Sequence, residues 1–315
     1  MKDLPKVALG TWSWGSGFAG GDQVFGNHLD EKSLKVVFDT AMKEGLNLWD
    51  TAAVYGMGSS ESLLGTFVKQ YPRENLLLST KFTPQIANAT ASNPLEEMLE
   101  KSFKRLGTDV IDIYWIHNPT ELNQWTHHLV PLLKSGKIKR VGVSNHTLEE
   151  IKLVNSTLAK EGFAISAVQN HYSLLYRSSE DAGILEYCQK NNITFFAYMV
   201  LEQGALTGRY NTNNPLPEGS GRAATYNKLL PQLENLTNTM KEIGERKNAS
   251  VAQIAIAWAI AKGTIPIIGV TKASHVEDAA RASNLILSVE EMAKLEALAQ
   301  KAGVNTKGAW EKPMV

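Results

Sequence analysis

The sequence predicts an α/β protein of the (β/α)8 TIM barrel class, with a long loop after the seventh strand and extra C-terminal helices. Short runs of apolar β-forming residues alternate with segments of helical period, a pattern typical of βα units around a parallel sheet. The runs are apolar on both faces, as buried parallel strands are, and eight of them fit into the 315 residues. No Gly-x-Gly-x-x-Gly fingerprint follows the first run, which argues against an open dinucleotide-binding sheet.

The expected strands and helices follow one another in a regular order. Among the helices, the one between the first two strands should begin after Asp30 and stop at Gly45, and the last should open with a capping box of Ser288 and Glu291. The strands are expected at residues 7–11, 46–50, 76–81, 110–117, 140–144, 167–170, 194–198 and 265–268.

The C-terminal third exceeds the minimal repeat. Residues 202–228 are rich in Gly, Asn and Pro and are expected to form a long loop, which suggests a functional lid. A helix at 229–247 should follow, and then a buried apolar helix at 251–261. Because no linker or repeat interrupts the pattern, residues 1–315 are interpreted as a single domain.

Composition excludes several classes of function. Lys+Arg and Asp+Glu number 32 each, so the balance favours neither nucleic acid nor a membrane surface as partner. The single cysteine, Cys188, is interpreted as a packed helix residue, with no metal site, and fits a reducing, cytoplasmic compartment. Residues 1–6 are too polar for a signal peptide, and residues 251–261 are too few for a membrane span. The pattern favours no particular oligomeric state.

Polar side chains stand at the ends of consecutive predicted strands. In barrels of this class the carboxyl ends of the strands form the active face, so these side chains are expected to converge. One such residue is typical of a structural hydrogen bond, whereas six consecutive strand ends indicate a site. The residues are Asp50, Lys81, His117, Ser144 with Asn145, Gln169 with Asn170, and Tyr198, and Tyr55 follows Asp50 by five positions.

Tyr55, Lys81 and Asp50 together would make a general acid. A cation about 4 Å from a phenol favours the phenolate by about 4 kcal/mol at an effective dielectric of about 20, and desolvation opposes that shift. We expect Lys81, held by Asp50, to lower the pKa of Tyr55 on balance. His117 would donate a second hydrogen bond to the same substrate oxygen. This set predicts carbonyl chemistry.

Residues 50–56, 79–81 and 116–117 resemble the catalytic tetrad regions of the aldo-keto reductases, and the match continues through 141–145, 168–170 and 206–210. The resemblance implies a barrel that binds extended NADPH and reduces an aldehyde or ketone to an alcohol by hydride transfer. It implies that Tyr55 is the proton donor and that Lys81 lowers the pKa of Tyr55. It further implies that Asp50 anchors Lys81 and that His117 orients the carbonyl of a small-molecule substrate.

The same resemblance implies a cofactor shell. Thr11, Ser144, Asn145, Gln169 and Tyr198 would surround the nicotinamide, with Tyr198 stacked on its ring. Leu201, Gly204 and Leu206 would approach the pyrophosphate, and Thr271 and Lys272 would bind the 2′-phosphate with His275 and Asp278 nearby. Ala279 stands where many members carry an adenine-binding asparagine, so NADH is a possible alternative to NADPH.

Tryptophans are the candidates for the substrate pocket. Trp12, Trp125 and Trp310 are each expected to form either an apolar wall or part of the core. Trp115 is expected to point away from His117 by strand alternation and to serve packing.

Two rival functions remain open at this point. An aldolase-like enzyme would use Lys81 as a Schiff-base nucleophile, which requires a neutral amine, whereas Asp50 would keep it charged. A non-catalytic NADPH-binding redox sensor or regulatory subunit would use the same barrel without turnover. Borohydride trapping would reveal the first, and the absence of carbonyl reduction would indicate the second.

Overall fold

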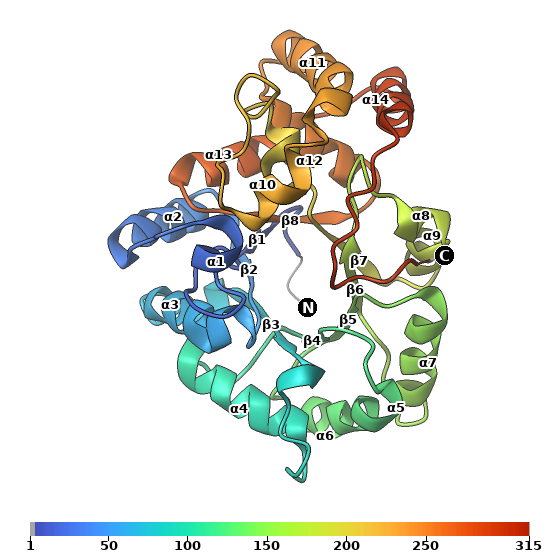
Figure 1. Cartoon of the computed structure of the whole chain (residues 1–315). Coiled ribbons are helices and arrows are strands. Elements are labelled where there is room, and N and C mark those ends of the chain that lie inside the picture. The colour runs from blue at the N-terminus through green and yellow to red at the C-terminus, as the bar shows by residue number, and fades with distance from the viewer. Residues whose placement is uncertain (1–3, 315) are drawn as a thin grey trace.

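A computed structural model describes residues 4–314, and the expectations for residues 1–3 and 315 lie outside the described part. Eight parallel strands close into a barrel in the order of the sequence, β1 to β8, which confirms the predicted fold class (Figure 1). The strands are β1 Ala8–Gly10, β2 Leu48–Asp50, β3 Leu77–Phe82, β4 Ile113–Ile116, β5 Val141–Ser144, β6 Ala167–His171, β7 Thr194–Tyr198 and β8 Ile265–Gly269. Every predicted strand is present; β1, β2, β4 and β5 are shorter than predicted, and β6 and β8 each extend one residue further.

The interior of the barrel is a small apolar cluster separate from the core under the helices. Trp115 and Phe196 meet there edge to face, with ring centroids 5.3 Å apart. Gly142 on the neighbouring strand makes room for the indole, because a Cβ at this position would lie 2.1 Å from Trp115. The expectation that Trp115 faces away from His117 is wrong: residues two apart on a strand share a face, and Trp115 fills the barrel interior below the site.

Helices surround the strands as the apolar periodicity predicts (Figure 1). Asp30 caps α2 by accepting from Ser33 N, and Ser288 and Glu291 form the capping box of α14, which confirms both predicted starts. The helices that follow the strands are α2 Glu31–Lys43, α3 Ser59–Val68, α4 Pro94–Leu106, α5 Leu122–Trp125, α6 Leu129–Lys134, α7 Leu148–Ala159, α8 Ser178–Asp181, α9 Ile184–Lys190, α13 Ala273–Ala282 and α14 Val289–Ala302.

The region after β7 is more ordered than the predicted loop. Residues 202–228 contain a 3-10 segment, η5 Glu202–Thr207, and a short helix, α10 Gly221–Tyr226. The α10 helix lies against α1 Gly21–Phe25, which belongs to the loop after β1. The two additional helices are confirmed as α11 Leu230–Lys247 and α12 Val251–Ala261. We refer to residues 201–228 below as the arm.

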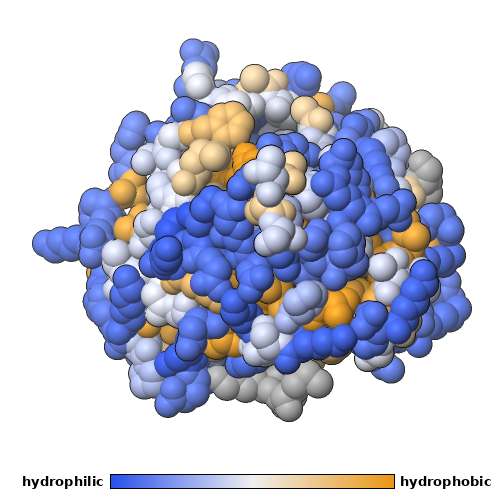
Figure 2. Space-filling view, turned by 90° about the horizontal axis from the view of Figure 1, so that it is seen from below, coloured by the Kyte–Doolittle hydropathy of each residue, from blue (hydrophilic) through white to orange (hydrophobic). Residues whose placement is uncertain are grey.

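The surface shows mainly polar residues on the side of α4 and α6, where hydrophobic residues lie in small groups between hydrophilic ones (Figure 2). Within residues 4–314 no helix is both long and apolar enough to cross a membrane. Residues 303–314, which follow α14, run back over the strand ends near β6 and β7 (Figure 1). We call this segment the tail.

Candidate active site

A buried ion pair lies at the ends of β2 and β3. Lys81 Nζ donates to Asp50 Oδ2 at 2.5 Å and to the carbonyl of Thr51 at 2.8 Å, and the Lys81 side chain is wholly buried. The second carboxylate oxygen of Asp50 accepts from Ser79 Oγ at 2.5 Å and from Gln169 Nε2 at 3.2 Å. Because a buried charge needs hydrogen-bond partners as well as a counter-ion, this network fixes the ammonium in one position.

Tyr55 reaches the same point from the turn after β2. Its hydroxyl lies 3.5 Å from Lys81 Nζ, and the ammonium also stands 5.1 Å from the ring centroid. The turn is sharp because Gly56 and Met57 both have positive φ, 57° and 50°. A Cβ at Gly56 would lie 2.1 Å from Ser59 Oγ, so only glycine fits there. The turn brings Tyr55 back over the strand ends.

The protonation of Tyr55 differs from the expectation. Burial raises the pKa of the Tyr55 phenol above its ordinary value, the Lys81 ammonium opposes this, and the Asp50 carboxylate adds to the rise. The expected lowering is therefore wrong for the protein alone: Asp50 neutralises much of the field of Lys81, and desolvation outweighs the rest. Tyr55 keeps its proton at neutral pH.

Lys81 remains an ammonium. Burial acts to lower the pKa of Lys81, but the Asp50 carboxylate beside it outweighs this effect and the net direction is upward. A Schiff-base nucleophile needs the free amine, so this environment disfavours the aldolase-like alternative.

His117 follows β4 and completes the set of four. Its ring stands edge-on to Tyr55 with centroids 5.9 Å apart, and its Nδ1 lies 2.8 Å from Thr83 Oγ1. Burial, and then the nearby charge of Lys81, lower the pKa of His117 well below its ordinary value, so the imidazole is neutral. Thr83 was not predicted, although strand alternation places residues 79, 81 and 83 on one face of β3 and its extension.

The residues expected around the nicotinamide lie together at the ends of β5 to β7. Asn145 has a positive φ of 63° and donates from Nδ2 to the carbonyl of His117 at 2.9 Å. Its Oδ1 accepts from Tyr198 Oη at 2.5 Å, and Ser144 Oγ lies 3.2 Å from its Nδ2. Both ends of the Asn145 amide are therefore engaged within the protein, as is the amide nitrogen of Gln169, which donates to Asp50.

Thr11 is fully buried at the end of β1. Its Oγ1 donates to the carbonyl of Asp50 at 3.3 Å and accepts from Ser60 Oγ at 2.9 Å. The hydroxyl therefore ties the strand end to α3, and the structure gives it internal partners rather than an open face.

The arm begins with the residues expected near a pyrophosphate. Leu201 and Leu206 are linked by a backbone hydrogen bond of 3.2 Å, and Gly204 between them has a positive φ of 111°. A Cβ on Gly204 would lie 3.1 Å from the ring of Tyr210. Nearby, Arg222 donates from Nη1 to the carbonyl of Gln203 at 3.3 Å, while its buried Nε has no hydrogen-bond partner within the described chain.

The expected 2′-phosphate residues lie at the start of α13. Lys272 is the exposed N-cap residue, with no side-chain cap bond, and His275 Nδ1 accepts from the backbone N–H of Thr271 at 3.3 Å. Burial, and then the charge of Lys272, lower the pKa of His275. Asp278 accepts from Gln253 on α12 at 2.7 Å, so its carboxylate serves helix packing.

Arg209 is a further cation near the start of α13, and the sequence did not identify it as a candidate ligand for the 2′-phosphate. Its charge contributes to the lowered pKa of His275, which places it near the start of α13 although it comes from the arm. Arg209 and Arg222 also flank Tyr210, at 5.4 and 5.8 Å from its ring centroid. Arg209 lies in residues 206–210, which resemble the family, but the sequence did not place it beside α13, because the proximity of two distant segments depends on the fold.

The tryptophans divide between wall and core. Trp12 stacks on Tyr55 at 5.9 Å and meets Trp310 edge to face at 5.6 Å, and half of Trp310 is exposed. Trp125 is 2% exposed and packs against Phe82, so the alternative that holds for Trp125 is core and not wall. Trp12 and Trp310 therefore form an aromatic wall beside the ring of Tyr55.

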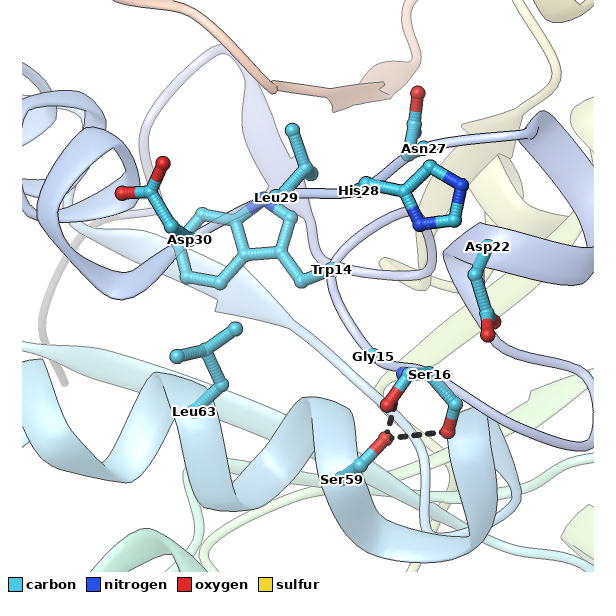
Figure 3. A pocket seen from close by; sticks show the side chains of 10 residues that line it. All are labelled: Trp14, Gly15, Ser16, Asp22, Asn27, His28, Leu29, Asp30, Ser59 and Leu63. Atoms are coloured by element: carbon cyan, nitrogen blue, oxygen red, sulfur yellow. Dashed lines mark hydrogen bonds between the residues drawn. The ribbon is translucent and has the colours of Figure 1, made fainter.

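A separate groove of about 410 Å3 lies outside this site, between the loop after β1 and α3 (Figure 3). Trp14 and Leu63 face each other across it, and Ser59 Oγ donates to the carbonyl of Ser16 at its floor. It contains none of the predicted site residues. Across residues 4–314 no group of three or more His, Cys, Asp or Glu side chains is arranged to hold a metal ion.

Comparison with known proteins places this site in context. The model of the "Aldo/keto reductase family" matches residues 6–300. A chloroplastic pyridoxal reductase of Arabidopsis thaliana is 32% identical over 95% of this chain and 84% of that protein. A Schizosaccharomyces pombe protein named as an NADP(+) aldo-keto reductase is 30% identical over 79% of this chain and 77% of that protein.

Solved structures give the same result. A thermostable aldo-keto reductase in complex with the inhibitor epalrestat superposes with a TM-score of 0.75 at 28% identity, covering 94% of this chain and 96% of that one. A Klebsiella pneumoniae aldo/keto reductase in complex with NADP and acetate gives 0.71 at 25% identity, over 98% and 94%.

Proposed function

The chain belongs to the aldo/keto reductase family, and from this premise we propose that it reduces an aldehyde or ketone to an alcohol with NADPH, using Tyr55 as general acid. The observation that carries the proposal is the convergence at one point of the Tyr55 hydroxyl, the Lys81 ammonium and the His117 ring. Residues 1–315 would act as one domain, because the loop after β1 and the tail both contribute to the wall beside Tyr55.

The residues around the barrel mouth fit a nicotinamide dinucleotide. The space beside Gly204, which a Cβ would fill, and the buried unpartnered Nε of Arg222 suit a diphosphate held by backbone and guanidinium groups. Lys272 and Arg209 would hold a 2′-phosphate at the start of α13. Ser144, Asn145, Gln169 and Tyr198 would hold the nicotinamide, whose role is to supply the hydride. NADH would bind more weakly, since it lacks the phosphate that these cations favour.

Tyr55 would hold the proton that the substrate oxygen needs. Burial keeps the phenol protonated in the protein alone, so the donor is in its active form at neutral pH. When negative charge develops on the carbonyl oxygen, the Lys81 ammonium beside Tyr55 would stabilise the phenolate that remains after donation. Asp50 would hold Lys81 in place through the 2.5 Å contact.

His117 would orient the carbonyl. If Thr83 donates to Nδ1, the ring hydrogen lies on Nε2, which would donate to the substrate oxygen beside Tyr55. The low pKa of His117 keeps the ring neutral, so that it directs the carbonyl without competing with Tyr55 as the acid.

The wall favours flat apolar carbonyl compounds. Trp12 and Trp310 present indole faces and edges beside Tyr55, which would stack on an aromatic aldehyde. Pyridoxal belongs in the substrate panel because a relative is named for its reduction. The cytoplasmic compartment stays a prediction, since that same relative is named chloroplastic.

The decisive experiment compares the wild type with Tyr55→Phe. Oxidation of NADPH is followed across aldehydes and ketones including pyridoxal, and cofactor affinity is measured by fluorescence quenching. We expect the variant to lose nearly all carbonyl reduction while its NADPH affinity stays within a few-fold, because only the proton donor is removed. Full activity in the variant would refute the mechanism. A wild type that binds NADPH but reduces no carbonyl would favour the sensor.

A further inference from the structure

A buried histidine outside the set of four sits between two carboxylates. His171 ends β6, and its Nε2 lies 3.0 Å from Glu202 Oε1 while its Nδ1 lies 3.0 Å from Glu311 Oε2. All three side chains are completely buried. Both ring nitrogens face carboxylate oxygens, and only the imidazolium can donate from both of them at once. With both glutamates ionised, these contacts favour a positive charge on His171.

The two glutamates belong to the segments that would carry cofactor and substrate. Glu202 is the first residue of η5 in the arm, next to Leu201, and Glu311 follows Trp310 in the tail. The sequence separations are 31 and 140 residues, so neither contact follows from local structure. His171 thus joins the arm and the tail to one strand end.

Further donors secure Glu202. Tyr226 of α10 donates to its Oε2 at 2.6 Å, and Thr306 of the tail donates to its Oε1 at 3.0 Å. Ser173, just beyond β6, donates to the same oxygen. Through these bonds, Tyr226 of the arm and Thr306 of the tail both contact the carboxylate of Glu202.

The ring of His171 also lies against the residue proposed to stack on the nicotinamide. Tyr198 is parallel to it within 26° at 5.6 Å, and Tyr176 lies within 27° at 4.4 Å. Tyr198 in turn donates to Asn145, which bonds the carbonyl of His117. A continuous chain of contacts therefore runs from His171 to the proposed catalytic residues.

We propose that His171 is a positioning residue that holds the arm and the tail against β6, so that the cofactor groove and the aromatic wall take their shape together. This inference rests on the proposed function. The cluster of His171, Glu202 and Glu311 touches neither Tyr55 nor Lys81, so it would govern the placement of ligands rather than the transfer of the proton.

The protonation of His171 agrees with this positioning role. Burial by itself would lower the pKa of His171, but the carboxylates of Glu202 and Glu311 raise it to about 9. The other titratable groups around the cluster are Tyr176, Tyr198 and Tyr226, whose pKa values are all raised, mainly by burial, and Lys307, which bonds the carbonyl of Glu311. Placement of the arm should therefore loosen as the pH rises past about 9.

The test measures the effect of each variant on substrate binding and on cofactor binding separately. In the holoenzyme, Glu311→Ala removes the tail anchor next to Trp310 but leaves Thr306 bonded to Glu202 and His171 paired with Glu202. KM for an aldehyde should therefore rise about 10-fold while the dissociation constant of NADPH changes little. His171→Gln leaves two buried carboxylates unpaired and should raise both constants about 10-fold to 100-fold. Lys312→Gln is the matched control, because it removes the neighbouring tail contact to Glu150 and touches neither His171 nor the arm.

The pH profile supplies a readout that a merely structural role would not move. In a Tyr55→Phe background, where no proton is transferred, NADPH affinity should fall above about pH 9 with His171 present and stay flatter with His171→Gln. Where His171→Gln alone does not fold, His171→Gln with Glu311→Gln removes one of the facing carboxylates and should fold with a raised KM. Hydrogen exchange of residues 303–314 reports release of the tail independently of turnover.

Clear outcomes overturn the proposal. A wild-type KM in Glu311→Ala and in the double variant would show that the tail needs no such anchor, and an equal effect of Lys312→Gln would show that any tail contact serves. A wild type that binds neither NADPH nor NADH would refute the proposed function instead, a result visible before any variant is made.

Discussion

The acid–base behaviour of Tyr55 depends on two opposing effects within a few ångströms. Desolvation favours the phenol, whereas Lys81 at 3.5 Å favours the phenolate. The sequence identified both groups but could not weigh them, because the depth of burial and the 2.5 Å contact that neutralises Lys81 depend on tertiary structure. The result is a phenol that keeps its proton at neutral pH.

Replacing Lys81 by Met should raise the pKa of Tyr55 further. The charge that opposes the rise in the pKa of Tyr55 disappears, and the Asp50 carboxylate, which raises it, remains. We expect turnover to fall severely and the alkaline limb of the pH–rate profile to move upward. Lys139→Met, which removes a half-exposed partner of Asp112, serves as control. An unchanged alkaline limb would make Lys81 a structural residue only.

Cofactor preference should depend on Lys272 and Arg209. A charge-assisted contact to the 2′-phosphate contributes about 1.5 to 3 kcal/mol, so Lys272→Ala should weaken NADPH roughly 10-fold to 150-fold and leave NADH nearly unchanged. Added salt should weaken NADPH in the wild type, since Lys272 is exposed. Fluorescence titration with both cofactors measures this. Equal losses for both, in Lys272→Ala and in Arg209→Ala alike, would make NAD(H) the preferred assignment.

Some residues of the proposed site could be predicted from the sequence, whereas others could not. Asp50, Lys81 and His117 stand at strand ends, where barrel geometry predicts convergence, and Thr83 was within reach of the same alternation. Arg209 lies in a stretch that resembles the family, but the positions of Arg209 and Glu202 in space could not be predicted, because contacts with α1 and the tail set the path of the arm. His171 lies one residue beyond the predicted end of its strand.

At the level of elements, local signals predicted most boundaries. Asp30, Ser288 and the apolar run at residues 251–261 each have a local physical cause in capping or periodicity, and the structure confirms all three. The two elements of the arm, η5 and α10, were not predicted, although α10 has a local signal in its N-cap residue. The order of η5 comes from buried long-range bonds to Glu202, and α10, although capped by Ser220, packs against α1.

The capping box of α12 offers a test of a local signal. Ser250 Oγ accepts from Gln253 N, and the side chain of Gln253 also donates to Asp278 on α13. Ser250→Ala should lower the free energy of unfolding by about 1 kcal/mol, because one N–H of the first turn loses its partner. Urea denaturation measures the change. Ser156→Ala, on the exposed side of α7, should leave it nearly unchanged; equal effects would contradict the capping argument.

For the whole molecule, closure of the barrel pairs every strand on both sides and brings the strand ends together at one rim. The eight strands pair in sequence order, so the sheet has no free edge, and the proposed catalytic and cofactor residues follow the strands at one rim. The alternation of strand and helix made this architecture predictable. The joining of arm and tail across the rim was not predictable, because it depends on contacts such as His171 with Glu311, 140 residues apart.

Global stability should fall on the alkaline side. The pKa of His171 is raised to about 9 in the folded protein, above the ordinary 6.5, so the folded state binds the proton more tightly. Its contribution, on the order of 3 kcal/mol, is complete below about pH 6.5 and is lost as the pH rises through about 9. Melting temperatures from pH 6 to 10 should fall more steeply in the wild type than in the His171→Gln, Glu311→Gln double variant. Parallel curves would contradict this assignment.

The contact between Trp12 and Trp310 sets an order of events during synthesis. The last barrel strand is complete at residue 269, whereas the indole that finishes the wall lies 41 residues later along the chain. All eight strands are therefore synthesised before Trp310, and the aromatic wall beside Tyr55 can be completed only after the last strand has been made.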